Sequence, residues 1–190
     1  MNKSNCGCSS CGSGCCCAGN IETETRQVVV DFLYLDLSVC EWCQGTEKNL
    51  EEAIASISNV LELAGIEVVL NKINVNTEEL AVKHKFVASP TIRVNGRDIQ
   101  MEVKERPCDS CGELCGDEVD CRVWVYKGQE YSIPPTALIV EGLLRSIFGH
   151  EDVKDEDSEY VLPENLKKFY TAIKNKNQCC SDKTKNSCCC

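Results

Sequence analysis

The sequence lacks the features that mark proteins acting on nucleic acids or in membranes. Its 20 lysines and arginines are outnumbered by 30 aspartates and glutamates, and the net charge is −10. Nucleic-acid binding relies on clustered basic residues, and here no basic group exceeds the pair Lys183 and Lys185. No apolar run reaches the roughly 20 residues that a membrane-spanning helix needs. We therefore expect neither a nucleic-acid partner nor a membrane partner.

A secretory signal is also missing, because the first residues lack the apolar stretch that such a signal contains. We therefore expect a cytoplasmic protein, in a compartment that keeps thiols reduced. The 17 cysteines stand out against that background. Because their number is odd, they cannot all pair with one another. In a reducing compartment they indicate redox or metal chemistry more than a disulfide framework.

The cysteines fall into four groups, two of which lie in polar tails at the ends of the chain. Both tails lack hydrophobic periodicity, so we expect them to be disordered until something binds them. Their adjacent and near-adjacent cysteines resemble metallothionein in composition, which implies binding of thiophilic ions. The two internal groups are Cys40 with Cys43, and Cys108, Cys111 and Cys115 with Cys121.

The composition along the chain predicts one folded domain between the tails. The expected segments are a tail over residues 1–25, a domain over 26–150 with a Cys-rich insert at 107–121, an acidic linker over 151–162, a helix over 163–176 and a tail over 177–190.

Hydrophobic periodicity within the domain predicts alternating strands and helices. β-branched and aromatic runs predict strands at 28–35, 66–73, 91–94 and 98–103. Apolar residues at helical spacing predict a long helix after Cys43 that ends before Gly65, a short helix at 78–84, and a helix from Pro135 to about Gly149. The dipeptides Asn95-Gly96 and Lys127-Gly128 predict hairpin turns.

The order of these elements resembles the thioredoxin-like superfamily. Two separated motifs carry the resemblance: Cys40-Glu41-Trp42-Cys43 between the first strand and the long helix, and Ser89-Pro90-Thr91 before the third strand. The resemblance implies an α/β, thioredoxin-like three-layer sandwich, here with a Cys-rich insert and disordered Cys-rich tails. It also implies that the peptide bond before Pro90 is cis and that Pro90 lies against the cysteine pair, where it shapes the substrate groove.

The position of Cys40 at the start of a helix predicts a reactive thiolate. Unpaired backbone N–H groups and the helix dipole favour the charged sulfur there. We expect Cys40 to act as the nucleophile and Cys43 to resolve the mixed disulfide or to share a bound metal. Val39 and the pair Glu41-Trp42 differ from thioredoxins proper, and the charge of Glu41 opposes a thiolate and favours a bound cation. Packed core thiols or a zinc knot are the alternatives.

The insert carries the dense cysteine array Cys108, Cys111, Cys115 and Cys121. Four thiolates suit a tetrahedral zinc site or a softer ion such as Cu(I), so these four residues are the predicted metal ligands. Their spacing matches neither a zinc ribbon nor the common ferredoxin patterns. Local disulfides, or relay thiols that pass oxidation on from Cys40 and Cys43, remain open as the alternative.

The middle of the chain, from Pro107 to Cys121 and on through Arg122 to Tyr126, is similar to an uncharacterised family of prokaryotic thioredoxin-like proteins. That family is distantly similar to the alkylmercury lyases, and the resemblance implies a context of soft-metal, arsenic or mercury resistance. Cleavage of an organomercurial would use two cysteines and a carboxylate, for which Cys40, Cys43 and either Asp36 or Glu41 are candidates.

Together these features predict a thiol–disulfide oxidoreductase that is linked to soft-metal or arsenic handling. Its substrate would be a disulfide, an oxidised thiol or a soft metal, and a thiol reductase would restore it. The redox reaction needs no cofactor, whereas the insert would bind zinc or another soft metal ion. The alternatives are a thiol-rich protein that sequesters metal without turnover and, as a weaker one, an organomercurial lyase.

Overall fold

The computed structural model describes residues 25–115, 118–149 and 159–181 of the chain. The predicted N-terminal tail up to residue 24, most of the acidic linker and the last part of the C-terminal tail lie outside the described residues. Within them the chain forms a mixed α/β fold with two sheets and five helices, so the predicted α/β class is confirmed.

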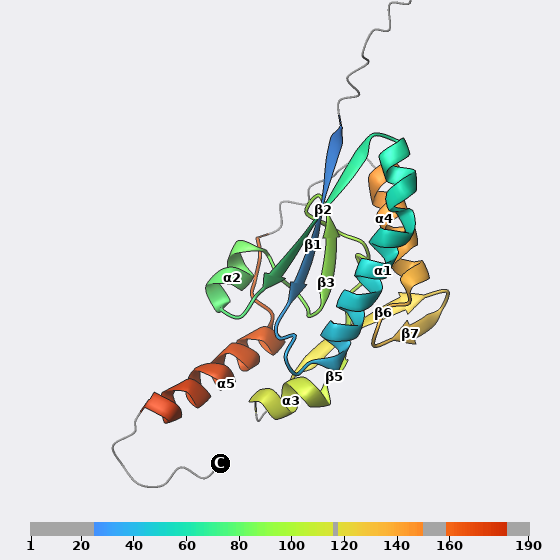
Figure 1. Cartoon of the computed structure of the whole chain (residues 1–190). Helices are drawn as coiled ribbons and strands as arrows, with labels where there is room; N and C mark the ends of the chain where they lie inside the picture. Colours follow the sequence, from blue (N-terminus) through green and yellow to red (C-terminus); the bar gives the residue numbers. More distant parts are fainter. Residues whose placement is uncertain (1–24, 116–117, 150–158, 182–190) are drawn as a thin grey trace, which may run out of the picture.

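The main sheet has the strand order β2-β1-β3-β4 (Figure 1). Its central strand β1 (Arg26–Tyr34) is parallel to β2 (Ile66–Asn74) and antiparallel to β3 (Thr91–Val94), and β4 (Arg97–Asp98) pairs at the edge. In this register Val30 lies between Leu70 and Val94. The run of β-branched residues in β1 therefore fits a strand that has a neighbour on each side and is covered on both faces.

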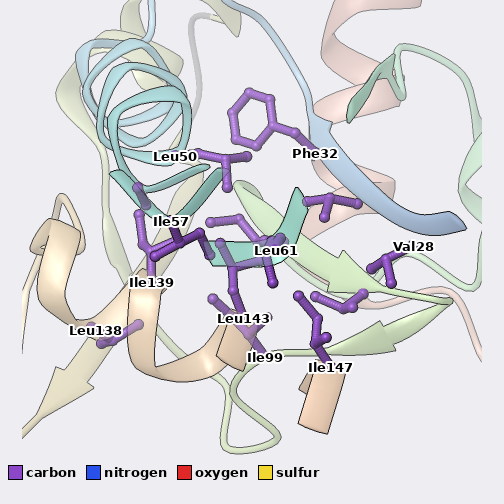
Figure 2. Packing of buried hydrophobic residues seen from close by; sticks show 14 of the residues in the cluster. Val28, Phe32, Leu50, Ile57, Leu61, Ile99, Leu138, Ile139, Leu143 and Ile147 are labelled. Atoms are coloured by element: carbon purple, nitrogen blue, oxygen red, sulfur yellow. The ribbon is translucent and has the colours of Figure 1, made fainter. Parts of the chain in front are cut away.

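One face of the sheet is covered by α1 (Glu41–Leu63) and α4 (Thr136–Phe148), which contact each other. Every third or fourth residue of α1 is buried, from Leu50 through Ile57 to Leu61, so one stripe of the helix faces the sheet. Figure 2 shows these side chains meeting Phe32 of β1 and Leu143 of α4. Helix α1 ends before Gly65, whose φ of 69° suits glycine.

The second sheet contains β5 (Lys104–Pro107), β6 (Asp120–Tyr126) and β7 (Gln129–Tyr131), all antiparallel. The strand predicted at 98–103 is wrong in its extent, because β4 stops at Asp98 and the chain crosses to the second sheet. The carboxylate of Asp98 accepts hydrogen bonds from the Gln100 backbone N–H and from the Arg122 guanidinium, which turns the chain away from β3. Both predicted hairpin turns are confirmed.

The three further helices are α2 (Glu78–Lys83), α3 (Asp109–Cys115) and α5 (Glu164–Ser181), and α5 contacts both α2 and α3. Helix α3 lies inside the Cys-rich insert, where no helix was expected, and α5 continues beyond the predicted limit at residue 176. Leu166, Phe169 and Tyr170 of α5 pack into a second core together with β1 and five cysteines. None of the described helices is long and apolar enough to cross a membrane.

Candidate metal centre

The loop after β1 fixes the sulfur of Cys40 at the beginning of α1. Asp36 Oδ1 accepts hydrogen bonds from the backbone N–H groups of Ser38 at 2.6 Å and Val39 at 3.2 Å, so this carboxylate holds the loop. Cys40 is the N-cap residue of α1, and its Sγ accepts the Cys43 backbone N–H at 3.3 Å. A thiol in this position faces the positive end of the helix dipole, as the sequence predicted.

The insert brings three further cysteines to the same place. Cys108 precedes α3, and its backbone N–H donates to the carbonyl oxygen of Val119 at 2.9 Å, which closes the insert at its base. Cys111 lies one helical turn further along α3. Cys121 lies on β6, and its Sγ is 3.4 Å from the Sγ of Cys111.

The four sulfur atoms of Cys40, Cys108, Cys111 and Cys121 all lie within 4.8 Å of one another. We call these residues the four-thiol cluster. In a tetrahedral zinc site, bonds of about 2.3 Å place the sulfurs roughly 3.8 Å apart, so the sulfurs would need to shift only slightly to surround an ion. The donor set is purely sulfur, which favours zinc, Cu(I) and other thiophilic ions over magnesium or calcium. The residues present therefore fit a soft metal ion.

The cluster is shielded from solvent. Cys40, Cys111 and Cys121 are fully buried, and Cys108 is 3% exposed. Arg122 is a buried cation next to Cys121 in the sequence, but its guanidinium binds the carboxylate of Asp98 and lies over the Trp124 ring. Its charge is therefore paired with Asp98. Buried thiolates without a counter-charge are costly, and a bound cation would remove that cost.

Hydrogen bonds among the thiols separate their pKa values. The pKa of Cys40 is lowered far below the ordinary value by S–H groups of Cys108, Cys111 and Cys121 that donate to its sulfur. The pKa of Cys111 is raised, chiefly by its hydrogen bond to Cys108, and the pKa of Cys121 is raised for the same reason. The pKa of Cys108 is also lowered, chiefly by its hydrogen bond to Cys111. Negative charge in the cluster therefore collects on Cys40 and Cys108, and Cys111 and Cys121 hold protons that a metal would displace.

Cys43 is fully buried beside the cluster but is not a member of it. Its Sγ lies 3.4 Å from Ser89 Oγ, and its pKa is raised by its hydrogen bond to Cys40 and by burial. The Ser89–Pro90 peptide bond is cis, which confirms that expectation. Ser89 also accepts the backbone N–H of Leu35 with its hydroxyl and that of Arg122 with its carbonyl oxygen, so this loop joins β1 to β6 beside the cysteines.

The structure regroups the residues that the sequence assigned to two separate sites. Cys40, expected to pair with Cys43 for redox chemistry, lies among three of the four predicted metal ligands. The side chain of the fourth predicted ligand, Cys115, lies outside the described residues. The spacing of Cys108 and Cys111 is the local signal for a shared site. No signal in the sequence indicated that the insert folds back onto the start of the long helix.

One surface cleft reaches the cluster at Cys108. It has a volume of about 830 Å³ and is open to solvent. Acidic residues gather along it, and its lining consists of Pro107, Cys108, Asp109, Gly112, Glu113, Glu118 and Val119. Cys108 is also the one cluster residue with residual exposure, so the cluster meets solvent at this cleft.

Fold and site together define an α/β protein with a buried four-cysteine cluster. Residues 28–142 match the family model described as Domain of unknown function (DUF2703), and the chain belongs to that family. No curated protein and no solved structure matches the chain. The matched segment includes the whole cluster, so the cluster lies within the family domain.

Proposed function

We propose that the domain binds a soft, thiophilic metal ion through Cys40, Cys108, Cys111 and Cys121. The observation that carries this proposal is the convergence of four buried sulfur atoms within 4.8 Å of one another. Cys40 completes the set of four ligands, so in this proposal it replaces Cys115, which was the fourth ligand predicted from the sequence. Zinc is the probe of choice, because its tetrahedral preference matches four thiolates.

Metal capture accounts for the burial of Cys40 better than disulfide exchange does. A thiolate that attacks a protein disulfide must be accessible to it, and the side chain of Cys40 is 0% exposed. A metal ligand has the opposite requirement, because a dry site strengthens the attraction between thiolates and cation. A bound ion would also tie the start of α1 to the insert, so binding and folding of the insert would be coupled.

A thioredoxin-like oxidoreductase is the second candidate. Cys40 at the helix N-cap, Cys43 one turn later and the cis peptide bond before Pro90 occur in the order that the thioredoxin-like resemblance implies. In this reading Cys40 is the nucleophile, Cys43 resolves the mixed disulfide, and Pro90 shapes the groove. A reversible Cys40–Cys43 disulfide that exchanges with a substrate in catalytic turnover is the observation that this candidate requires.

The test uses the full-length chain with the eleven tail cysteines replaced by serine, which we call the tail-serine chain. The replaced residues are Cys6, Cys8, Cys11, Cys15, Cys16, Cys17, Cys179, Cys180, Cys188, Cys189 and Cys190. The tail-serine chain, purified without oxygen, is titrated with Co²⁺ and then with Zn²⁺. We expect one ion per chain and a thiolate-to-cobalt charge-transfer band that zinc abolishes.

Single substitutions in the tail-serine chain identify the ligands. Cys40→Ser and Cys121→Ser should each weaken binding strongly, whereas Cys115→Ser in the same insert serves as the matched control and should leave the stoichiometry unchanged. Binding that survives Cys40→Ser but is lost in Cys115→Ser would show that the insert alone forms the site. Absence of the charge-transfer band in the tail-serine chain would refute metal binding by the cluster.

A further inference from the structure

Cys40 is a member of the four-thiol cluster and also a neighbour of Cys43. It cannot serve as a metal ligand and form a disulfide with Cys43 at the same time. Its sulfur is a member of the four-thiol cluster, within 4.8 Å of the three insert sulfurs. The same sulfur accepts the backbone N–H of Cys43 at 3.3 Å, and the two cysteines lie about one helical turn apart at the start of α1. A disulfide with Cys43 would consume a metal ligand, because a sulfur bonded to another sulfur is no longer a thiolate.

Among the five cysteines whose side chains the structure describes, Cys43 is the one that lies outside the cluster. Its Sγ faces Ser89 Oγ at 3.4 Å, on the side of the cis peptide bond, and its side chain is fully buried. With metal bound, the other cluster sulfurs would be occupied as ligands, and Cys43 would be the remaining thiol among the described side chains that lies beside Cys40. A four-cysteine site does not need a fifth thiol in this position as a ligand.

We propose that oxidation of Cys40 and Cys43 to a disulfide releases the metal from the four-thiol cluster, and that reduction restores the site. This inference rests on the proposed metal binding and adds its regulation. The affinity of the site then depends on the redox state of one pair. Loss of one direct ligand should weaken binding by more than the roughly 10–100-fold that removal of an outer hydrogen-bond partner costs.

The reaction balances with a hydroperoxide as the oxidant. The Cys40 thiolate attacks one oxygen of hydrogen peroxide, which forms a sulfenic acid on Cys40 and releases hydroxide. The Cys43 sulfur then attacks the Cys40 sulfur, the S–S bond forms, and the sulfenic oxygen leaves as water with the Cys43 proton. The two cysteines lose two electrons, the peroxide is reduced to two molecules of water once the hydroxide is protonated, and the ion leaves three remaining thiolates. Hydrogen peroxide is a small oxidant, and the cleft beside Cys108 brings solvent to the edge of the cluster.

The experiment follows zinc release from the zinc-loaded tail-serine chain after addition of hydrogen peroxide. A chromogenic chelator reports the zinc, and peptide mass spectrometry identifies the disulfide. We expect one zinc released per Cys40–Cys43 disulfide, and we expect a dithiol reductant to restore binding. The Cys43→Ser variant should bind zinc with the same stoichiometry and release it at least tenfold more slowly.

The remaining outcomes distinguish a failure of the redox inference from a failure of the proposed metal binding. Equal release rates in Cys43→Ser and the parent, or a disulfide between Cys111 and Cys121, would overturn the inference and leave metal binding intact. A parent chain that binds no zinc would overturn both. If Cys43→Ser fails to fold, Cys43→Ala gives the same comparison, and the disulfide mapped in the parent decides the matter independently.

Discussion

Replacing Cys40 by serine should cut a metal-dependent cross-link between two distant parts of the chain. Cys40 lies at the start of α1, whereas the other cluster cysteines lie between Cys108 and Cys121. A bound ion therefore joins segments about 70 residues apart, and a cross-link that closes a loop of this size stabilises a fold by roughly 4 kcal/mol through the entropy it removes from the unfolded chain. The three insert cysteines can still hold an ion without Cys40, but that ion no longer reaches α1.

The assay is urea unfolding of the tail-serine chain, with zinc and with a chelator. Zinc should raise the free energy of unfolding of the parent by about 4 kcal/mol. Mass action predicts a gain of the same size when the free zinc concentration is roughly a thousand times the dissociation constant. Most of that gain should disappear in Cys40→Ser, while the stability in chelator changes much less. The same zinc-dependent gain in Cys40→Ser and in the parent would refute the cross-link through Cys40.

Three further outcomes test the fold and the site. Leu143→Ala should lower the free energy of unfolding by about 2–5 kcal/mol because this side chain fills the core between α4 and the sheet, whereas Leu63→Ala, at 91% exposure, should change it by less than about 0.5 kcal/mol in the same urea assay. Asp98→Ala should cost about 3–5 kcal/mol because it leaves the buried guanidinium of Arg122 without its carboxylate partner, and Lys174→Ala, which breaks an exposed ion pair, should cost much less. Zinc affinity measured by competition should fall as the pH is lowered, because binding displaces thiol protons.

The strands and helices of the main sheet could be predicted because their signals are local. The β-branched run around Val30, the helical stripe that ends at Leu61 and the turn at Asn95-Gly96 each indicate their element without reference to the rest of the chain. The short β4 could not be predicted in this way. Its end depends on the contact of Asp98 with Arg122, a residue far along the chain.

The sequence identified each cysteine of the candidate site, but it did not predict that these four cysteines form one site. Cys40 was singled out by its position at the start of a predicted helix, and Cys108, Cys111 and Cys121 were singled out by their dense spacing. Their convergence depends on the pairing of β5 with β6 and on the hydrogen bond from Arg122 N to Ser89 O, which attach the insert to the main sheet. These contacts join residues too far apart for a spacing rule to reveal them.

X-ray absorption at the zinc edge on the zinc-loaded tail-serine chain tests the four-cysteine site most directly. The proposal predicts four sulfur ligands at about 2.3 Å and no oxygen or nitrogen ligand, and it predicts three sulfurs with one oxygen or nitrogen in Cys40→Ser. A parent spectrum with fewer than four sulfurs, or a Cys40→Ser spectrum identical to the parent's, would contradict a site that Cys40 completes.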